Sequence, residues 1–343
     1  MNELKGKVVA VMGGAGFIGH NLALALKSLG AEPHVVDSLQ VNNLGAYTSG
    51  PNPDPNSDLY IAFINQRLDL LRRARIALHV IDIRDYHMVT RCLTAIKPDV
   101  VIHLAAIAHA NRSNKDPFST FDHSIRTLEN VLDAVRERHC HLVYFSSSLV
   151  YGHFNGEAVT EDRHCSPLGI YGALKYGAER LVIGYNQVFN LPYTIIRPSA
   201  LYGQRCVSRR VGQAFIENAL RGHPLTVTGA SDSLDFTYID DLVQGVTLAI
   251  ARPEARNEIF NITYGSARTV GELAEMVREH FPGLELTHAD RETLMPERGT
   301  LSIDKARRLL GYEPAHPLEK GFVEYIRWYK QLAAEQPELF HEH

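Results

Sequence analysis

The chain has 343 residues, and its 45% hydrophobic and 22% charged residues are typical of a folded globular protein. Its 35 basic and 39 acidic residues give a formal net charge of −4, which argues against nucleic acid or an anionic membrane surface as a partner. No apolar run approaches the roughly 20 residues of a membrane span, and a strand pattern begins too early for a signal peptide. The four cysteines lack metal-ligand spacing and suit a reducing compartment, so we expect a cytoplasmic protein without a metal site.

Residues 7–37 have the pattern of a dinucleotide-binding unit. A short apolar run at 8–12 predicts a buried parallel strand, a longer run at 17–29 predicts a helix, and 33–36 predict a second strand that ends at Asp37. A carboxylate at this point would hold the ribose hydroxyls of an adenosine, and it would repel a 2′-phosphate. The cofactor expected from this pattern is therefore NAD rather than NADP. A glycine-rich turn without a ligand is the alternative, but it does not explain the acid.

Three glycines at three-residue spacing connect the first strand to the helix. Gly13 permits the tight turn, Gly16 lets the backbone approach a pyrophosphate, and Gly19 lets the helix pack closely on the sheet. The N–H groups at the start of the helix, where Phe17 and Ile18 lie, would face the phosphates.

The next part of the chain continues the alternation of strands and helices. Residues 38–58 predict a surface loop, and 59–77 predict an amphipathic helix. Four arginines of that helix are expected to face solvent: Arg67, Arg72, Arg73 and Arg75. A strand at 76–83 ends in Asp82 and Ile83, which could bracket an adenine; the alternative for Asp82 is that it caps a turn. Further elements are predicted as a helix at 88–96, a strand at 100–104, a loop at 107–117, a helix at 118–138 and a strand at 141–145.

The regular alternation predicts an α/β fold with a doubly wound parallel sheet and right-handed crossovers. Ligands of such sheets bind at the carboxyl ends of the strands. Leu104, Ala105 and Ala106 follow one strand, and their backbone would lie against the nicotinamide ribose and the pyrophosphate. The serines at 146–148 follow the next strand, where catalysis is expected.

Tyr171 and Lys175 lie on a predicted helix at 168–190, and their i, i+4 spacing places them on one face. A phenol with a pKa near ~10 is a poor base at neutral pH, but a nearby cation favours the phenolate. Lys175 is therefore expected to lower the pKa of Tyr171. The phenolate could take a proton from an alcohol while the carbon beneath loses a hydride to nicotinamide. Ser147 could hydrogen-bond the same oxygen.

These motifs resemble those of the extended short-chain dehydrogenase/reductases, specifically the NAD-dependent nucleotide-sugar epimerase/dehydratase family. The matching segments are GGAGFIG at 13–19, VVDSL at 35–39, DIRD at 82–85, HLAA at 103–106, SSSLVYG at 146–152, YGALK at 171–175, RPSALYG at 197–203, LDFTYIDD at 234–241, FNI at 260–262 and LLGYEP at 309–314. The resemblance implies a Rossmann fold, a catalytic triad of Ser147, Tyr171 and Lys175, and a tightly held NAD that is reduced and reoxidised in one turnover. It also places Pro198 among the cofactor contacts.

The resemblance further implies two domains and a dimer. Residues 1–196, with 236–262 returning to them, would form the NAD-binding domain, and 197–235 with 263–335 a smaller C-terminal α/β substrate-binding domain. The second part is predicted to contain a strand at 223–228 and helices at 207–221, 270–281, 303–310 and 318–332. Many relatives dimerise through two helices per subunit, and the helices at 118–138 and 168–190 match them. We therefore expect a homodimer.

One departure from the family narrows the reaction. Related sugar 4,6-dehydratases place Asp-Glu directly after the catalytic hydroxyl residue, whereas this chain has Ser148 and Leu149. Leucine cannot remove a proton from carbon, which leaves epimerisation at C4 of a nucleotide-activated sugar through a transient 4-keto intermediate. If His109, Asn111 or Arg112 supplied an acid and a base from another loop, a dehydratase would remain an alternative.

The same three catalytic residues would also serve a net dehydrogenase or a 4-keto reductase, so both reactions stay open. A non-catalytic NAD-sensing protein is more remote, because such proteins normally lose the tyrosine or the lysine.

The segments expected to hold the substrate also depart from the family. Ala200 replaces an asparagine and Leu234 an arginine that commonly bind the sugar diphosphate. Arg205, Arg209, Arg210 and Arg298 could compensate, because a diphosphate needs several donors. The residues expected to bind the nucleotide-sugar substrate are His109, Arg112, Ser148, Ser199, Arg205, Arg210 and Arg298.

Overall fold

The computed structural model describes residues 2–48, 56–107, 110–138, 140–291 and 295–340. Its centre is a seven-stranded sheet with the order β11-β6-β5-β4-β1-β2-β3, in which every pair of neighbours is parallel. The strands are β1 (Val8–Met12), β2 (Glu32–Asp37), β3 (Ala77–Val80), β4 (Val100–His103), β5 (His141–Phe145), β6 (Tyr193–Arg197) and β11 (Glu258–Asn261). The predicted doubly wound parallel sheet is confirmed.

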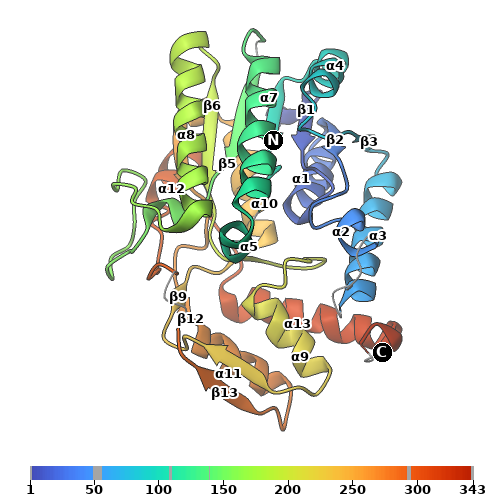
Figure 1. The fold of residues 1–343 in the computed structure, drawn as a ribbon, viewed down its shortest axis with the longest axis vertical. Helices are drawn as coiled ribbons and strands as arrows, with labels where there is room; N and C mark the ends of the chain where they lie inside the picture. Colours follow the sequence, from blue (N-terminus) through green and yellow to red (C-terminus); the bar gives the residue numbers. More distant parts are fainter. Residues whose placement is uncertain (1, 49–55, 108–109, 139, 292–294, 341–343) are drawn as a thin grey trace.

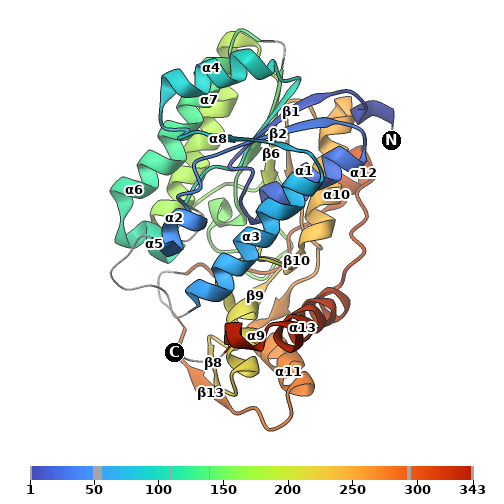
Figure 2. The same cartoon turned by 90° about the vertical axis from the view of Figure 1, so that its right-hand side faces the viewer.

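Helices cover both faces of this sheet, as Figures 1 and 2 show. One face carries α4 (Tyr86–Ile96), α7 (Thr127–Val135) and α8 (Gly169–Phe189), and the other carries α1 (Phe17–Ser28), α10 (Ile239–Ala251) and α12 (Asp304–Leu310). Ala10 and Met12 belong to the first core, and Val9 and Val11 to the second. Successive strand residues point to opposite faces, which explains why β1 is apolar throughout.

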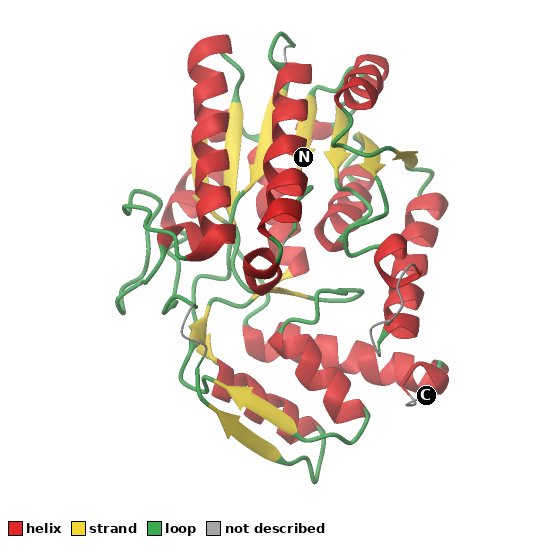
Figure 3. Ribbon diagram, viewed as in Figure 1, coloured by secondary structure: helices red, strands yellow, loops and turns green. Residues whose placement is uncertain are grey.

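A smaller part of the molecule lies beyond the carboxyl ends of the strands (Figure 3). In it β8 (Leu225–Thr228) pairs in parallel with β13 (Leu286–Ala289), next to α9 (Val211–Leu220), α11 (Val270–His280) and α13 (Leu318–Glu335). Two short pairs accompany them: β7 (Leu201–Tyr202) with β10 (Thr237–Tyr238), and β9 (Ser233–Leu234) with β12 (Arg268–Thr269). Among the described residues, no helix combines the length and apolar character that crossing a membrane requires.

Three predicted segments differ from the structure in the type or number of their elements. The predicted loop 38–58 contains α2 (Leu44–Thr48), and the loop 107–117 contains α5 (Ala110–Lys115). The predicted helix 118–138 is divided into α6 (Pro117–Phe121), a π-helix η2 (Asp122–Arg126) and α7. α6 begins one residue early because Asp116 accepts the backbone N–H of Ser119 at 3.0 Å and a proline occupies the first turn.

Two elements pack across the boundary expected between the two parts. The first half of α3 (Ser57–Arg73) contributes Tyr60 and Phe63 to the core of the smaller part, although α3 lies directly before β3 of the main sheet in the chain. Conversely, α12 packs in the core beneath the main sheet, together with Tyr312. Apolar side chains decide both placements, and their burial joins the two parts into one structure.

Candidate active site

A cavity of about 160 Å³ lies at the carboxyl ends of β1, β2, β3 and β4, and we call it the glycine-turn cavity. Eleven predicted cofactor-binding residues line it: Gly13, Gly16, Phe17, Ile18, Gly19, Asp37, Asp82, Ile83, Leu104, Ala105 and Ala106. They come from the turns that follow four strands, which meet at this edge because the strands are parallel.

The backbone of this cavity fits the pyrophosphate of NAD. Gly16 is the N-cap of α1 and provides no side-chain hydrogen bond to the first turn, so the N–H groups of that turn are available for an anion. A Cβ atom at Gly13 would lie 2.9 Å from the Ala105 nitrogen, and one at Gly19 would lie 2.5 Å from the Gly14 Cα. These two glycines therefore permit close packing of the chain on itself, which holds the turn in shape.

Asp37 ends β2 in this cavity. Its two carboxylate oxygens accept the backbone N–H groups of Ala15 at 3.0 Å and Leu39 at 2.8 Å. Burial raises the pKa of Asp37, while the two N–H groups oppose the rise. The carboxylate is thus fixed next to the turn, where it can also accept ribose hydroxyls.

Asp82, which also lines this cavity, is held by an arginine. Arg84 pairs with the Asp82 carboxylate at 2.6 Å and also bonds Asp122 of the π-helix at 3.2 Å and Gln40 at 3.1 Å. The hydrogen bond from Arg84 lowers the pKa of Asp82. Arg84 therefore links the loop after β2, the end of β3 and η2 around the predicted adenine end.

A second cavity of about 160 Å³, which we call the tyrosine cavity, contains Ser147, Tyr171 and Lys175. Ser147 is the N-cap of a short 3-10 helix, η3 (Ser148–Tyr151), where its hydroxyl accepts the backbone N–H of Leu149 at 3.2 Å, and its side chain also acts to lower the pKa of Tyr171. The neighbouring Ser146 instead donates to Glu179 of α8. Of these two serines, only Ser147 is aimed at Tyr171.

Burial shifts the pKa values of Tyr171 and of the neighbouring Lys175 in opposite directions. Burial raises the pKa of Tyr171, and the Arg210 guanidinium and the hydrogen bond to Ser147 oppose the rise. Burial lowers the pKa of Lys175 to about 8, although Glu179 opposes this. Lys175 donates to the Phe145 carbonyl at 2.6 Å. Among the described groups, Arg210 and Ser147 lower the pKa of Tyr171; the role predicted for Lys175 in lowering it stays a prediction.

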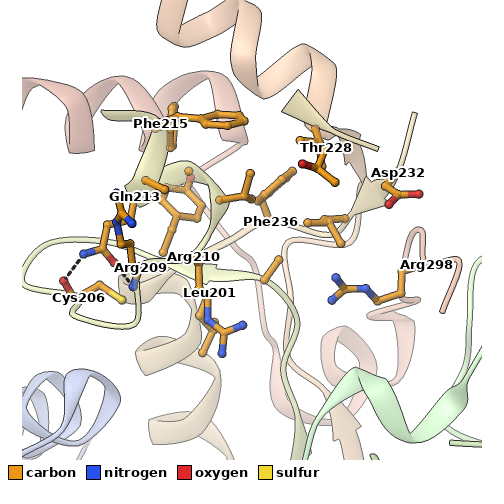
Figure 4. A pocket seen from close by; sticks show the side chains of 18 of the residues that line it. Leu201, Cys206, Arg209, Arg210, Gln213, Phe215, Thr228, Asp232, Phe236 and Arg298 are labelled. Carbon is orange, nitrogen blue, oxygen red and sulfur yellow. Dashed lines mark hydrogen bonds between the residues drawn. The ribbon is translucent and has the colours of Figure 1, made fainter. Parts of the chain in front are cut away.

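A third and larger cavity of about 420 Å³ lies against α9, and we call it the α9 cavity. Figure 4 shows the aromatic side chains of Phe215 and Phe236 toward one end, and Arg210 and Arg298 toward the other. Burial lowers the pKa of Arg298 to about 10, and the charge of Arg210 acts in the same direction. Two neighbouring guanidinium groups that repel each other form a site suited to a multiply charged anion.

The predicted substrate residues are distributed unevenly. Ser148, Ser199, Arg210 and Arg298 line the tyrosine cavity, as do the predicted cofactor contacts Tyr171, Lys175 and Pro198. Arg205 lines none of the three cavities, because its side chain faces His20 of α1 at 3.4 Å. His109 lies outside the described residues, and the side chain of Arg112 is likewise not described. Ala200 and Leu234 both line the α9 cavity.

Arg67 was expected on the solvent side of its helix, and this prediction is wrong. It is fully buried, and its Nε donates to the Arg205 carbonyl at 2.9 Å. The cause is the loop after β7, which covers that face of α3. Burial lowers the pKa of Arg67 to about 10. Arg72 and Arg73, in contrast, have side chains 74% exposed, in agreement with the prediction.

Several lining residues of the glycine-turn cavity were not predicted to bind the cofactor: Ser38, Val41, Asn42, Arg67, His123, Thr127, Leu201, Val207, Ser208 and Arg210, the last of which was predicted to bind the substrate. Ser38 and Asn42 follow Asp37 closely, and this proximity is a signal that could have identified them. His123 belongs to the π-helix, whose extra residue per turn alters which side chains face the sheet. An uninterrupted helical pattern gives no warning of that change.

Comparison with known proteins identifies the family. The family model described as "NAD dependent epimerase/dehydratase family" matches residues 9–263. An uncharacterized UDP-glucose epimerase, YtcB, of Bacillus subtilis is 34% identical over 239 residues, which cover 68% of this chain and 75% of that protein. UDP-glucuronate 4-epimerase 1 of Arabidopsis thaliana is 28% identical over 94% of this chain and 76% of its own length.

Solved structures agree with this assignment. The UDP-glucuronic acid 4-epimerase of Bacillus cereus, in complex with UDP-glucuronic acid and NAD, superposes with a TM-score of 0.81 at 29% identity, covering 94% of this chain and 99% of that one. The UDP-glucose 4-epimerase of Thermotoga maritima with UDP-glucose gives 0.81 at 26% identity, covering 94% and 98%. The chain belongs to the NAD-dependent epimerase/dehydratase family, an enzyme family whose cofactor is NAD.

Proposed function

We propose that this protein is an NAD-dependent 4-epimerase of a nucleotide-activated sugar. The observation that carries the proposal is the composition of the tyrosine cavity. Among its described lining residues none is Asp or Glu, and the two residues after Ser147 are Ser148 and Leu149. Loss of water from a sugar needs an acid and a base at the carbon skeleton. Epimerisation at C4 needs only one acid–base group, which removes and returns the proton of the C4 hydroxyl, and Tyr171 can serve as that group.

The relatives support the same reaction class. The Arabidopsis thaliana protein is named a UDP-glucuronate 4-epimerase, and the Bacillus cereus structure is a 4-epimerase that contains UDP-glucuronic acid and NAD. UDP-glucose and UDP-glucuronic acid are therefore the first substrates to test.

In the proposed mechanism the sugar lies in the tyrosine cavity with its C4 hydroxyl at Tyr171. Tyr171 accepts the hydroxyl proton. After the 4-keto sugar has rotated to present its opposite face, Tyr171 returns the proton, so that the other epimer is formed without net proton loss. Ser147 orients the hydroxyl, and Lys175 fixes the end of β5 through the Phe145 carbonyl. NAD, held by the glycine-turn cavity, would supply reversible hydride acceptance at C4.

We propose that Arg210 and Arg298 hold the diphosphate, since both line the tyrosine cavity and the α9 cavity. Their guanidinium groups replace the donors lost at Ala200 and Leu234. The nucleoside would extend into the α9 cavity toward Phe215 and Phe236. Ser148 and Ser199 would contact the sugar.

The test is incubation of the purified protein with a panel of nucleotide sugars in deuterated water, followed by proton NMR. We expect the C4 epimer, no solvent deuterium at C3 or C5, and no lasting change in nicotinamide absorbance. A 4-keto-6-deoxy product would establish a dehydratase instead, and deuterium at C5 would show that a carbon-bound proton is removed.

We also propose a homodimer formed through α8 and the segment that contains α6, η2 and α7. Their surface exposes large apolar side chains, including Phe118 at 84% and Val188 at 70% exposure, which is unusual for a monomer. Sedimentation at micromolar concentration should give twice the chain mass, and Val188→Asp should shift it to the monomer. A wild-type protein that sediments as a monomer would refute the proposal.

We assign a different ligand to each of the two parts of the molecule. We propose that 1–196 with 236–262 bind NAD and that 197–235 with 263–335 bind the substrate. We further propose a cytoplasmic location, in line with the four free and buried cysteines. Cell fractionation tests the location.

A further inference from the structure

Arg67 places a buried positive charge at the wall of the glycine-turn cavity. It belongs to α3 and is fully buried, and it lines that cavity together with Asp37. Burial lowers the pKa of Arg67 to about 10, so the guanidinium still carries its charge at neutral pH. A charge that is removed from water needs an opposite charge or a full set of hydrogen bonds.

The hydrogen-bond donors of Arg67 are only partly used. A guanidinium has five N–H bonds in a fixed fork. Nε and Nη2 form one edge of the fork, and both donate to the Arg205 carbonyl, at 2.9 Å from Nε. Nη1 is buried and has no hydrogen-bond partner among the residues that the structure describes. Buried donors without a partner are rare in folded proteins, which points to a bound group as the missing acceptor.

The carboxylates that line this cavity have donors of their own. Both oxygens of Asp37 accept backbone N–H groups, and Asp82 is paired with Arg84. The cofactor of the family adds further acceptors, because the ADP moiety of NAD carries two anionic phosphates and two ribose hydroxyls. A guanidinium is well suited to such oxygens, above all to those of a phosphate.

The neighbours of Arg67 place it beside the part of the cavity where the ADP moiety is expected. The Arg205 side chain lies 3.4 Å from His20 of α1, and the other ring nitrogen of His20 lies 3.0 Å from the Gly16 carbonyl. The residue whose carbonyl Arg67 holds therefore also contacts the first turn of α1, which faces the pyrophosphate. Asp37, expected at the ribose, lines the same cavity.

We propose that Arg67 is a further cofactor-binding residue, whose Nη1 donates to an oxygen of the ADP moiety of NAD. One edge of the fork then holds the loop after β7, and the other edge holds the cofactor. This inference concerns the NAD site and does not rest on the sugar reaction that the enzyme performs.

The alternative is that Arg67 only fixes the loop after β7. That loop has two other side-chain contacts: Tyr47 of α2 donates to the Val207 carbonyl at 3.0 Å, and Gln213 of α9 donates to the Cys206 carbonyl at 2.8 Å, as Figure 4 shows for the second. Tyr47 lines none of the three cavities. Tyr47→Phe is therefore a matched control, since it removes a contact to the same loop and no group from the cavity.

The experiment measures the exchange of bound NAD for isotope-labelled NAD in the holoenzyme. Arg67→Met, which removes every donor at similar length, should exchange NAD about 10- to 100-fold faster, the usual effect of losing a hydrogen bond to a charged group. Arg67→Lys keeps the charge and a donor for the Arg205 carbonyl but lacks the fork, and it should also exchange NAD faster. Tyr47→Phe should exchange NAD at the wild-type rate.

Competition against labelled NAD then locates the contact on the cofactor. ADP should compete about 10- to 100-fold less effectively in Arg67→Met than in the wild type, whereas nicotinamide mononucleotide should compete equally in both. If circular dichroism shows that Arg67→Met does not fold, the same comparison in Arg67→Lys decides. A wild-type exchange rate in Arg67→Lys, an equal acceleration in Tyr47→Phe, or an equal loss of competition by both nucleotides would overturn the inference.

Discussion

At the scale of single residues, Tyr171, Lys175 and Ser147 of the site are all buried, whereas Arg210 is exposed. Tyr171 and Lys175 are buried, and burial acts on both in the direction of their neutral forms. Ser147 and Arg210 are the groups that favour the phenolate. The chemistry proposed for Tyr171 therefore depends on neighbours from three segments, although the tyrosine itself is found from a short motif.

Tyr171→Phe should reduce turnover by about 10²- to 10⁴-fold, the usual contribution of a positioned acid–base group. NAD should remain bound, because the glycine-turn cavity is unchanged. The measurement is the epimerisation rate together with the nicotinamide released on denaturation. Tyr176→Phe is the control, since Tyr176 lies on the same helix but packs away from the tyrosine cavity. Activity retained in Tyr171→Phe would move the proton acceptor elsewhere.

Ala200 pays a conformational cost where it lines the α9 and tyrosine cavities. Its φ is +35°, a left-handed conformation that a Cβ atom disfavours. Ala200→Gly should therefore stabilise the protein, by about 0.5–1 kcal/mol. Ala173→Gly, at an exposed position within α8, should destabilise it by about 1 kcal/mol. Urea unfolding distinguishes the two, and destabilisation by Ala200→Gly would contradict the argument.

At the scale of elements, helix ends are defined by identifiable groups. Thr269 and Glu272 form a capping box at the start of α11: the Glu272 N–H donates to the Thr269 hydroxyl at 3.0 Å, and the Thr269 N–H donates to the Glu272 carboxylate at 2.6 Å. Such a box fixes the first turn of a helix whose buried face packs in the smaller core.

Thr269→Ala should lower the free energy of unfolding by about 1 kcal/mol. The hydrogen bonds from Thr269 lower the pKa of Glu272, so their contribution is present above the ordinary pKa of the carboxyl and is lost as pH falls through its lowered value. The difference between variant and wild type should therefore shrink in acid. Glu275→Ala, in the middle of the same helix, should change stability by less than about 0.5 kcal/mol. An equal effect of both variants would argue against the cap.

The elements also show what the sequence could and could not predict. The parallel sheet, the glycine turn and Asp37 were predictable because apolar runs and spacing are local properties. The π-helix was not, since its extra residue leaves the apolar pattern at 118–138 unbroken. Arg67 was not predictable either. Its burial depends on the loop around Arg205, more than a hundred residues away in the chain, and the four arginines of the predicted helix 59–77 look alike without that loop.

At the scale of the whole molecule, the α9 cavity depends on how the smaller part is held to the sheet. Glu217 of α9 is fully buried and accepts hydrogen bonds from Tyr60 of α3 at 2.9 Å and from Tyr329 of α13 at 2.9 Å. Burial raises the pKa of Glu217, and these donors oppose the rise. One carboxylate thus joins a helix that precedes β3 to two helices of the smaller part.

Tyr60→Phe should destabilise the protein by about 1–3 kcal/mol, because it leaves a buried carboxylate with one donor fewer. Tyr86→Phe removes the same kind of bond at the surface, where Tyr86 donates to Asp133 at 2.7 Å, and should cost less than about 0.5 kcal/mol. The ring centroids of the single tryptophan, Trp328, and of Phe63 lie 5.1 Å apart. The fluorescence of Trp328 therefore reports the contact between α3 and α13. Because the core is shared, fluorescence and circular dichroism should give one coincident urea transition, shifted as a whole by Tyr60→Phe. A fluorescence transition that precedes the loss of helix would show that the smaller part unfolds independently.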